Sequence, residues 1–135
     1  MTHKFSFTIF LLCTLIFTLP NCGESEPYPQ GKNLYSFHCQ NCHMEDGVGL
    51  GALIPPLAGA DYMAQHQDQM ACIIQYGLMD TIVVNGVTYM EPMAGIEGLN
   101  NIQITNLINY INHAWGNDYG FVTVEQIDEQ LKNCN

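Results

Sequence analysis

The chain has 135 residues, and 13 acidic side chains against 3 basic ones give it a formal net charge of −10 at pH 7. A general nucleic-acid-binding protein needs a basic surface to neutralise phosphates, so this balance excludes that class. By electrostatic complementarity, an acidic protein favours a partner with a basic docking surface, although the same charge is equally consistent with a role in solubility alone.

The first 21 residues are predicted to be an export signal. Lys4 precedes an apolar run over residues 5–19, which Pro20 closes. This run is shorter than the roughly 20 residues of a membrane-spanning helix, and its basic start is typical of a secretory signal peptide. The following Cys22 stands in a sequence that resembles a bacterial lipoprotein box. Ordinary cleavage nearby, leaving Cys22 as a spare thiol, is the alternative.

We therefore expect an exported, periplasmic protein whose membrane contact is a lipid on Cys22. Residues 22–29 are polar and contain prolines, so they should form an extended tether. Residues 30–135 remain for a single domain, which is enough chain to bury a hydrophobic core. All acidic residues lie beyond position 23, where only Lys32 and Lys132 are basic, so the exported part is more acidic than the whole chain.

The first predicted helix begins near Gly31 and ends on the pentad Cys39-Gln40-Asn41-Cys42-His43. In an exported protein, C-x-x-C-H is typical of covalent attachment of a c-type haem. Two thiols three residues apart on a helical turn lie on nearly the same face, so each can add to one vinyl group of the same porphyrin. His43 is then placed to bind the iron. One such motif predicts one covalent haem c.

Further along the chain, Gly47, Gly49 and Gly51 interrupt regular structure, and two prolines keep the following segment extended. A helix is predicted over residues 68–76, with Gly77 as its stop and an inward face of Met70, Ile73 and Ile74. Residues 81–84 and 87–90 flank Asn85-Gly86, which predicts a small hairpin with a type I′ turn.

Two more helices are predicted near the C-terminus. One spans residue 101 to about residue 115, with Asn100 as N-cap and Gln103 three residues on. The last begins after Thr123, which forms a capping box with Gln126. Its inward stripe is predicted to contain Val124, Ile127, Leu131 and Cys134. The short helices would make a thin core alone, so we expect a small all-α domain wrapped around another group.

From about residue 29 to residue 117, the sequence resembles class I, monohaem cytochromes c. Gly31 and Tyr35 stand eight and four residues before Cys39, where the family has a glycine and an aromatic residue that pack against its last helix. Leu107 and Tyr110 match the facing positions. Residues 85–95 resemble the family's segment before the sixth iron ligand, and residues 110–117 resemble its closing helix with a Trp-Gly-Asn ending.

The resemblance implies the remaining haem contacts. Pro55 matches the proline whose carbonyl accepts a hydrogen bond from the second ring nitrogen of the iron-binding histidine, which orients His43. Alignment of the Asn-Gly turn and Leu99 places Met93 at the sixth-ligand position, fifty residues after His43. Pro92 precedes this methionine, whereas the family usually has a proline after it. Met90 is the fallback ligand.

Filled His and Met axial positions would leave no place for a substrate at the iron. The family resemblance therefore implies a non-enzymatic electron carrier, or a subunit of a respiratory or dehydrogenase chain, which cycles between Fe(III) and Fe(II). One alternative is an open-site haem enzyme or gas sensor in which Met93 is labile or absent from the iron. Another is a zinc or dithiol site built from Cys39, Cys42 and His43 plus another cysteine.

Beyond the predicted signal peptide, two cysteines remain once the haem and lipid cysteines are assigned, and both are expected in an oxidising compartment. Cys72 falls on the helix predicted over residues 68–76, and Cys134 on the inward stripe of the last helix. A disulfide between them would close a loop of about 62 residues and stabilise the fold by about 4 kcal/mol on the chain-entropy model. Two separate buried thiols are the alternative.

Overall fold

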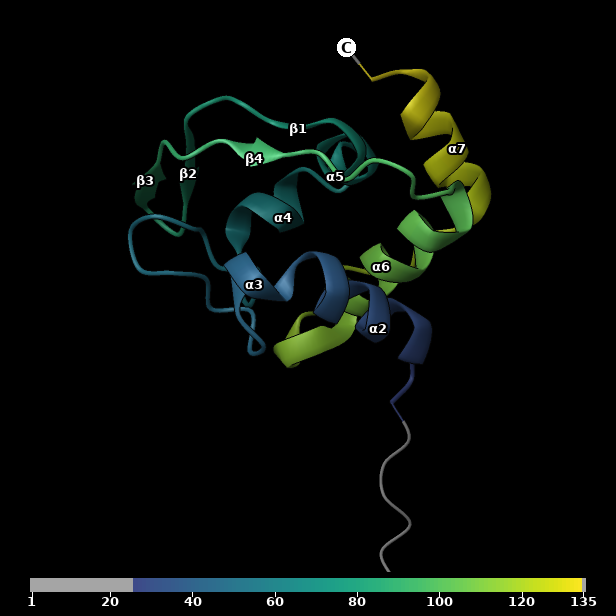
Figure 1. Cartoon of the computed structure of the whole chain (residues 1–135), viewed down its shortest axis with the longest axis horizontal. Coiled ribbons are helices and arrows are strands. Elements are labelled where there is room, and N and C mark those ends of the chain that lie inside the picture. The colour runs from purple at the N-terminus through teal and green to yellow at the C-terminus, as the bar shows by residue number, and fades with distance from the viewer. Residues whose placement is uncertain (1–25, 135) are drawn as a thin grey trace, which may run out of the picture.

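A computed structural model describes residues 26–134 (Figure 1). The predicted signal peptide and residues 22–25 of the predicted tether, Cys22 included, lie outside these residues. Within the described range, no helix is long and apolar enough to cross a membrane.

The described chain is mainly helical, with two short antiparallel strand pairs (Figure 1). In order, its elements are α2 (Pro29–His38), α3 (Gln40–His43), α4 (Asp61–Gln65), α5 (Met70–Tyr76), β1 (Gly77–Leu78), β2 (Ile82–Val84), β3 (Val87–Tyr89), β4 (Met93–Ala94), α6 (Asn101–His113), the 3₁₀ turn η2 (Ala114–Gly116) and α7 (Val124–Lys132). The predicted small helical domain with a minor hairpin and an extra C-terminal helix is confirmed.

The crossing of α2 and α6 forms the centre of the fold. A Cβ atom added to Gly31 would lie 2.1 Å from the carbonyl oxygen of Asn106, so only glycine allows the two backbones to come this close. One turn later, Tyr35 is buried with its ring centroid 5.5 Å from that of Tyr110. The inner face of α6 is fully buried at Ile104, Leu107 and Ile108. This crossing fixes the helix that leads into the pentad.

The hairpin of β2 and β3 turns at Asn85-Gly86, as predicted. Both residues have positive φ, 50° and 79°, as a type I′ turn requires. The turn is also tied to α4, because Asn85 and Asp61 each accept a hydrogen bond from the other's backbone N–H, at 3.1 and 2.7 Å. The hairpin therefore closes over the start of α4.

Several element bounds differ from the sequence predictions. The helix expected over residues 68–76 begins at Met70, and α4 was not predicted. The pairing of β1 with β4 was also not predicted, because it joins residues far apart in the chain. Helix α6 ends at His113 rather than near Trp115, since Ala114 is extended and Trp115 has a φ of 54°.

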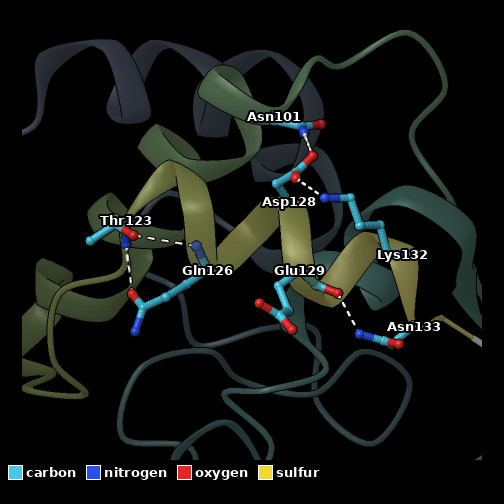
Figure 2. A network of polar contacts seen from close by, with 7 residues as sticks. All are labelled: Asn101, Thr123, Gln126, Asp128, Glu129, Lys132 and Asn133. Atoms are coloured by element: carbon cyan, nitrogen blue, oxygen red, sulfur yellow. Dashed lines mark hydrogen bonds and ion pairs between the residues drawn. The ribbon is translucent and has the colours of Figure 1, made fainter.

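Helix α7 has the predicted capping box, in which Thr123 and Gln126 exchange side-chain to backbone hydrogen bonds (Figure 2). Ile127 is fully buried, as predicted. The prediction that Val124 also lies on the inward stripe is wrong, because its side chain is 37% exposed. The predicted disulfide between Cys72 and Cys134 is confirmed, with the two Cα atoms 5.6 Å apart. It joins α5 to Cys134, two residues beyond the end of α7.

Candidate functional site

The main cavity of the domain has a volume of about 510 Å³, within the range of cofactor pockets. Its walls come from the end of α2, from α3, from the segment around Pro55, from α4 and α5, and from the chain between Leu78 and Ile96. In Figure 1, α3 lies below and β4 above the middle of this arrangement. Most of the lining is aliphatic or thioether, so the cavity suits a large apolar group.

The three functional side chains of the pentad all line this cavity. Cys39 is buried, Cys42 is exposed, and neither is in a disulfide. Helical hydrogen bonds hold this turn, since the backbone N–H groups of Cys42 and His43 both donate to the Cys39 carbonyl, at 3.1 and 2.9 Å. Burial is the larger and the nearby Cys42 the smaller cause that raises the pKa of the Cys39 thiol to about 12. Cys39 is therefore protonated at neutral pH.

His43 is buried, and its ring is oriented by the backbone. Its Nδ1 lies 3.0 Å from the carbonyl oxygen of Pro55, which places the ring proton on Nδ1 and leaves Nε2 with a free lone pair. Burial lowers the pKa of the imidazole, and the hydrogen bond to Pro55 partly opposes this shift. A neutral histidine with a defined tautomer is the form that binds a metal.

The loop that carries Pro55 packs closely against the pentad. The backbone N–H of Gly49 donates to the His43 carbonyl at 3.1 Å. A Cβ atom at Gly49, whose φ is +71°, would lie 2.3 Å from the Ile54 carbonyl oxygen. Only glycine therefore permits this approach, which brings Pro55 to the ring of His43.

The two candidate methionine ligands occupy different environments. Met93 lies on β4, is partly buried and lines the cavity. Met90 is 75% exposed and does not line it. Met63 and Met70 also line the cavity, and both are buried in the core as expected for apolar filling residues. The structure thus brings Cys39, Cys42, His43 and Met93 to one cavity and leaves Met90 at the surface.

Comparison with known proteins agrees with this arrangement. Residues 26–111 match the family model described as cytochrome c oxidase, cbb3-type, subunit III. The chain belongs to this family of c-type cytochrome domains.

Two kinds of relative are similar to this cytochrome. Cytochrome c-552 of Thermus thermophilus is 32% identical over 90 residues, which cover 64% of this chain and 68% of the relative. The cytochrome c subunit of the quinone alcohol dehydrogenase of Gluconobacter oxydans is 28% identical over 92 residues, which cover 65% of this chain but only 19% of that subunit. The chain thus spans about a fifth of the dehydrogenase subunit.

A cytochrome c domain implies covalent haem c, and the residues of the cavity fit that group. Two free thiols and a neutral imidazole line one side of an apolar cavity of cofactor size, and a thioether also lines it. Cytochromes c of this family are typically electron carriers.

Two charged residues of the cytochrome's cavity were missed in the sequence. Asp80 and Glu91 are its charged lining residues, and both are carboxylates. Glu91 could have been found from its place in the chain, because it stands only two residues before the candidate ligand Met93. Asp80 has no such signal. Among residues 26–134, no group of three His, Cys, Asp or Glu side chains could hold a metal ion.

Proposed function

We propose that the protein is a single-haem electron-transfer protein in which Cys39 and Cys42 form the two thioether bonds to haem c. His43 and Met93 are the proposed axial ligands of the iron. The observation that carries the proposal is that all four side chains line one cavity, whereas the competing Met90 is 75% exposed. Its cellular role is that of a carrier, or a subunit, in a respiratory or dehydrogenase chain.

When bound, haem c supplies a one-electron Fe(III)/Fe(II) couple. The chain's residues determine how this couple behaves. The Pro55 carbonyl fixes the ring of His43 and makes Nε2 a better donor. The Met93 thioether is a soft, neutral donor that favours the ferrous form. The apolar walls exclude water, which lowers the local dielectric around both ligands.

The surface charge supports a redox partner with a basic docking surface. Both lysines of the described range are paired with an acid: Lys32 lies 3.2 Å from Glu26, and Lys132 pairs with Asp128. Most of the acidic side chains among residues 26–134 therefore have no lysine partner within that range, and a basic protein partner would be steered toward them. Among the relatives, the cytochrome c subunit of a quinone alcohol dehydrogenase is an example of a cytochrome that is a subunit of an enzyme.

The identity of the sixth ligand can be tested by replacing each candidate methionine. We expect Met93→Ala to abolish the methionine-to-ferric charge-transfer band and to make the haem bind carbon monoxide or cyanide readily. The Met90→Ala variant is the matched control and should keep the wild-type spectrum, because Met90 lies outside the cavity. Loss of the band in Met90→Ala alone would show that Met90 is the ligand.

The same spectra distinguish the competing function. A wild-type protein with high-spin ferric haem that binds cyanide readily, or binds carbon monoxide readily once reduced, would have an open iron site. That result would favour the haem enzyme or gas sensor over the electron carrier.

We further propose that residues 1–21 are an export signal, that residues 22–29 are a tether and that residues 30–135 form the cytochrome domain. Cys22 is the proposed lipid attachment site and would hold the domain at a membrane in the periplasm. Labelled fatty acid should be incorporated into the wild-type protein and not into Cys22→Ala. Equal labelling of the two proteins, or labelling of neither, would exclude the anchor at Cys22.

A further inference from the structure

Helix α7 lies outside the matched family segment, residues 26–111, yet it packs against a wall of the cavity. No residue of α7, which the structure describes in full, lines the cavity itself. Its central residue Ile127 is completely buried. After its end, Cys134 forms the disulfide with Cys72 of α5. The extra helix is therefore attached to the core at α5.

Helix α5 has two faces with different contacts. Met70, Ile73 and Ile74 line the cavity. Cys72 is bonded to Cys134. The disulfide therefore ties α7 to the helix that forms this cavity wall.

Gln130 of α7 makes a second connection, at the start of α5. Helix α5 has no side-chain cap of its own. The Oε1 atom of Gln130 accepts a hydrogen bond from the Ala71 backbone N–H at 3.2 Å, and its Nε2 donates to the Gln67 carbonyl at 3.1 Å. One amide from α7 thus satisfies an N–H group of the first turn of α5 and holds the segment before it.

The segment before α5 is also fixed from the core side. The side-chain amides of Gln67 and Asn112 bond reciprocally, at 2.7 and 3.3 Å, and Asn112 is completely buried. Gln67 donates as well to the carbonyl of Met63, which lines the cavity. The start of α5 is therefore held between α6 on one side and α7 on the other.

The end of α5 is linked to the backbone of Met93 by a strand pair. Strand β1 follows α5 and pairs with β4, so that Leu78 is the register partner of Met93. The backbone N–H of Ile96 donates to the carbonyl of Ile74 at 2.9 Å. A Cβ atom at Gly95 would lie 2.6 Å from the Gln75 carbonyl oxygen, so this approach leaves little freedom. The position of Met93 therefore depends on the position of α5.

We infer that α7 positions Met93 through α5, and that Gln130 and the Cys72–Cys134 disulfide are its positioning groups. The inference rests on the proposed function, because it takes Met93 to be the iron ligand. Contacts from α7 through α5 to β4 form a continuous path of bonded and packed groups, which is one way that such coupling is carried. Loosening α7 from α5 should let Met93 leave the iron more often, although neither Gln130 nor the disulfide touches the cavity.

The test compares two variants of the haem-loaded full chain, the double variant Cys72→Ser with Cys134→Ser, and Gln130→Met. The measurement is the rate at which the ferric protein binds imidazole, which requires Met93 to leave the iron. We expect a rate about tenfold above wild type in each variant, within the range that mutations along a coupling path produce. Gln130→Met keeps the disulfide, so it tests the inference even if the double variant does not fold.

Thr123→Ala and Asp128→Ala are matched controls on α7 (Figure 2). Thr123 caps α7 itself, and Asp128 bonds to Asn101 of α6 and to Lys132, so these changes loosen α7 without removing a contact with α5. Both controls should bind imidazole at close to the wild-type rate. Faster binding in the two α5 variants and not in the controls would support the inference.

Two results would overturn it. The first is a lower unfolding temperature in the α5 variants with an unchanged imidazole rate, which would make α7 a stabilising element only. The second is an equal rate increase in the controls, which would show general loosening of the domain. A wild-type ferric protein without the methionine charge-transfer band would instead refute the proposed ligation, and the inference would be overturned together with it.

Discussion

The double variant Cys39→Ala with Cys42→Ala should lose its haem and should not keep this fold. Without a bound group, the cavity of about 510 Å³ would have to remain empty or collapse. At about 24 cal/mol per Å³, an empty cavity of this size corresponds to roughly 12 kcal/mol, which is as large as the whole stability of a typical domain, about 5–15 kcal/mol. Near-ultraviolet circular dichroism and urea unfolding would measure the loss of fixed packing.

Phe37→Ala is a suitable control for this experiment. Phe37 precedes the pentad by two residues, and its side chain is 79% exposed, so its removal changes neither the thiols nor the cavity. It should keep the haem and a cooperative unfolding transition. A haem-free double variant that unfolded cooperatively at the wild-type urea midpoint would contradict the prediction, because the fold would then not depend on a filled cavity.

Gly31→Ala should lower the free energy of unfolding by about 3 kcal/mol, the upper range for overpacking a close contact. The sign is opposite to the usual one, since replacing glycine by alanine inside a helix normally favours the helix by about 1 kcal/mol. Here the added methyl would lie 2.1 Å from the Asn106 carbonyl oxygen and 2.6 Å from the Cβ atom of Tyr110. Helices α2 and α6 would have to separate.

Urea denaturation would measure this loss, and Ser36→Ala in the same helix provides the control. Ser36 is exposed, so alanine there should leave stability unchanged or raise it slightly. If Gly31→Ala were as stable as Ser36→Ala, the two helices would not approach as closely as the structure places them.

The parts of the fold that sequence reasoning predicted depend on a few neighbouring residues. Asn100 and Thr123 each bond to a backbone N–H three residues on, so the starts of α6 and α7 could be located from a four-residue pattern. The Asn85-Gly86 turn was equally local, because both positions need positive φ. In each case the residues that determine the geometry are adjacent in the sequence.

The parts that were missed depend on contacts between distant residues. Strands β1 and β4 have two residues each, too few to show an alternating pattern, and they form because the end of α5 meets the segment around Met93. Helix α4 is a five-residue helix whose first residue, Asp61, exchanges hydrogen bonds with Asn85. Neither element has a strong local signal, so tertiary packing determines both.

Residues of the candidate site could be proposed from the sequence alone where they stand next to one another in the chain. Cys39, Cys42 and His43 form one contiguous motif, whereas Met93 could be selected only through the family resemblance. The disulfide followed from counting the remaining cysteines, but the second contact of α7 with α5, through Gln130, did not. Its hydrogen bonds join the Gln130 side chain to backbone groups about sixty residues away, which no sequence spacing indicates.

The most direct test of the central claim is the visible and near-infrared absorption spectrum of the purified wild-type protein in its ferric state. Haem attached at Cys39 and Cys42 and ligated by His43 and Met93 should give a low-spin spectrum with the methionine-to-ferric charge-transfer band. The haem should also remain with the polypeptide after denaturation. A high-spin spectrum without that band, or haem that separates from the denatured chain, would contradict the account.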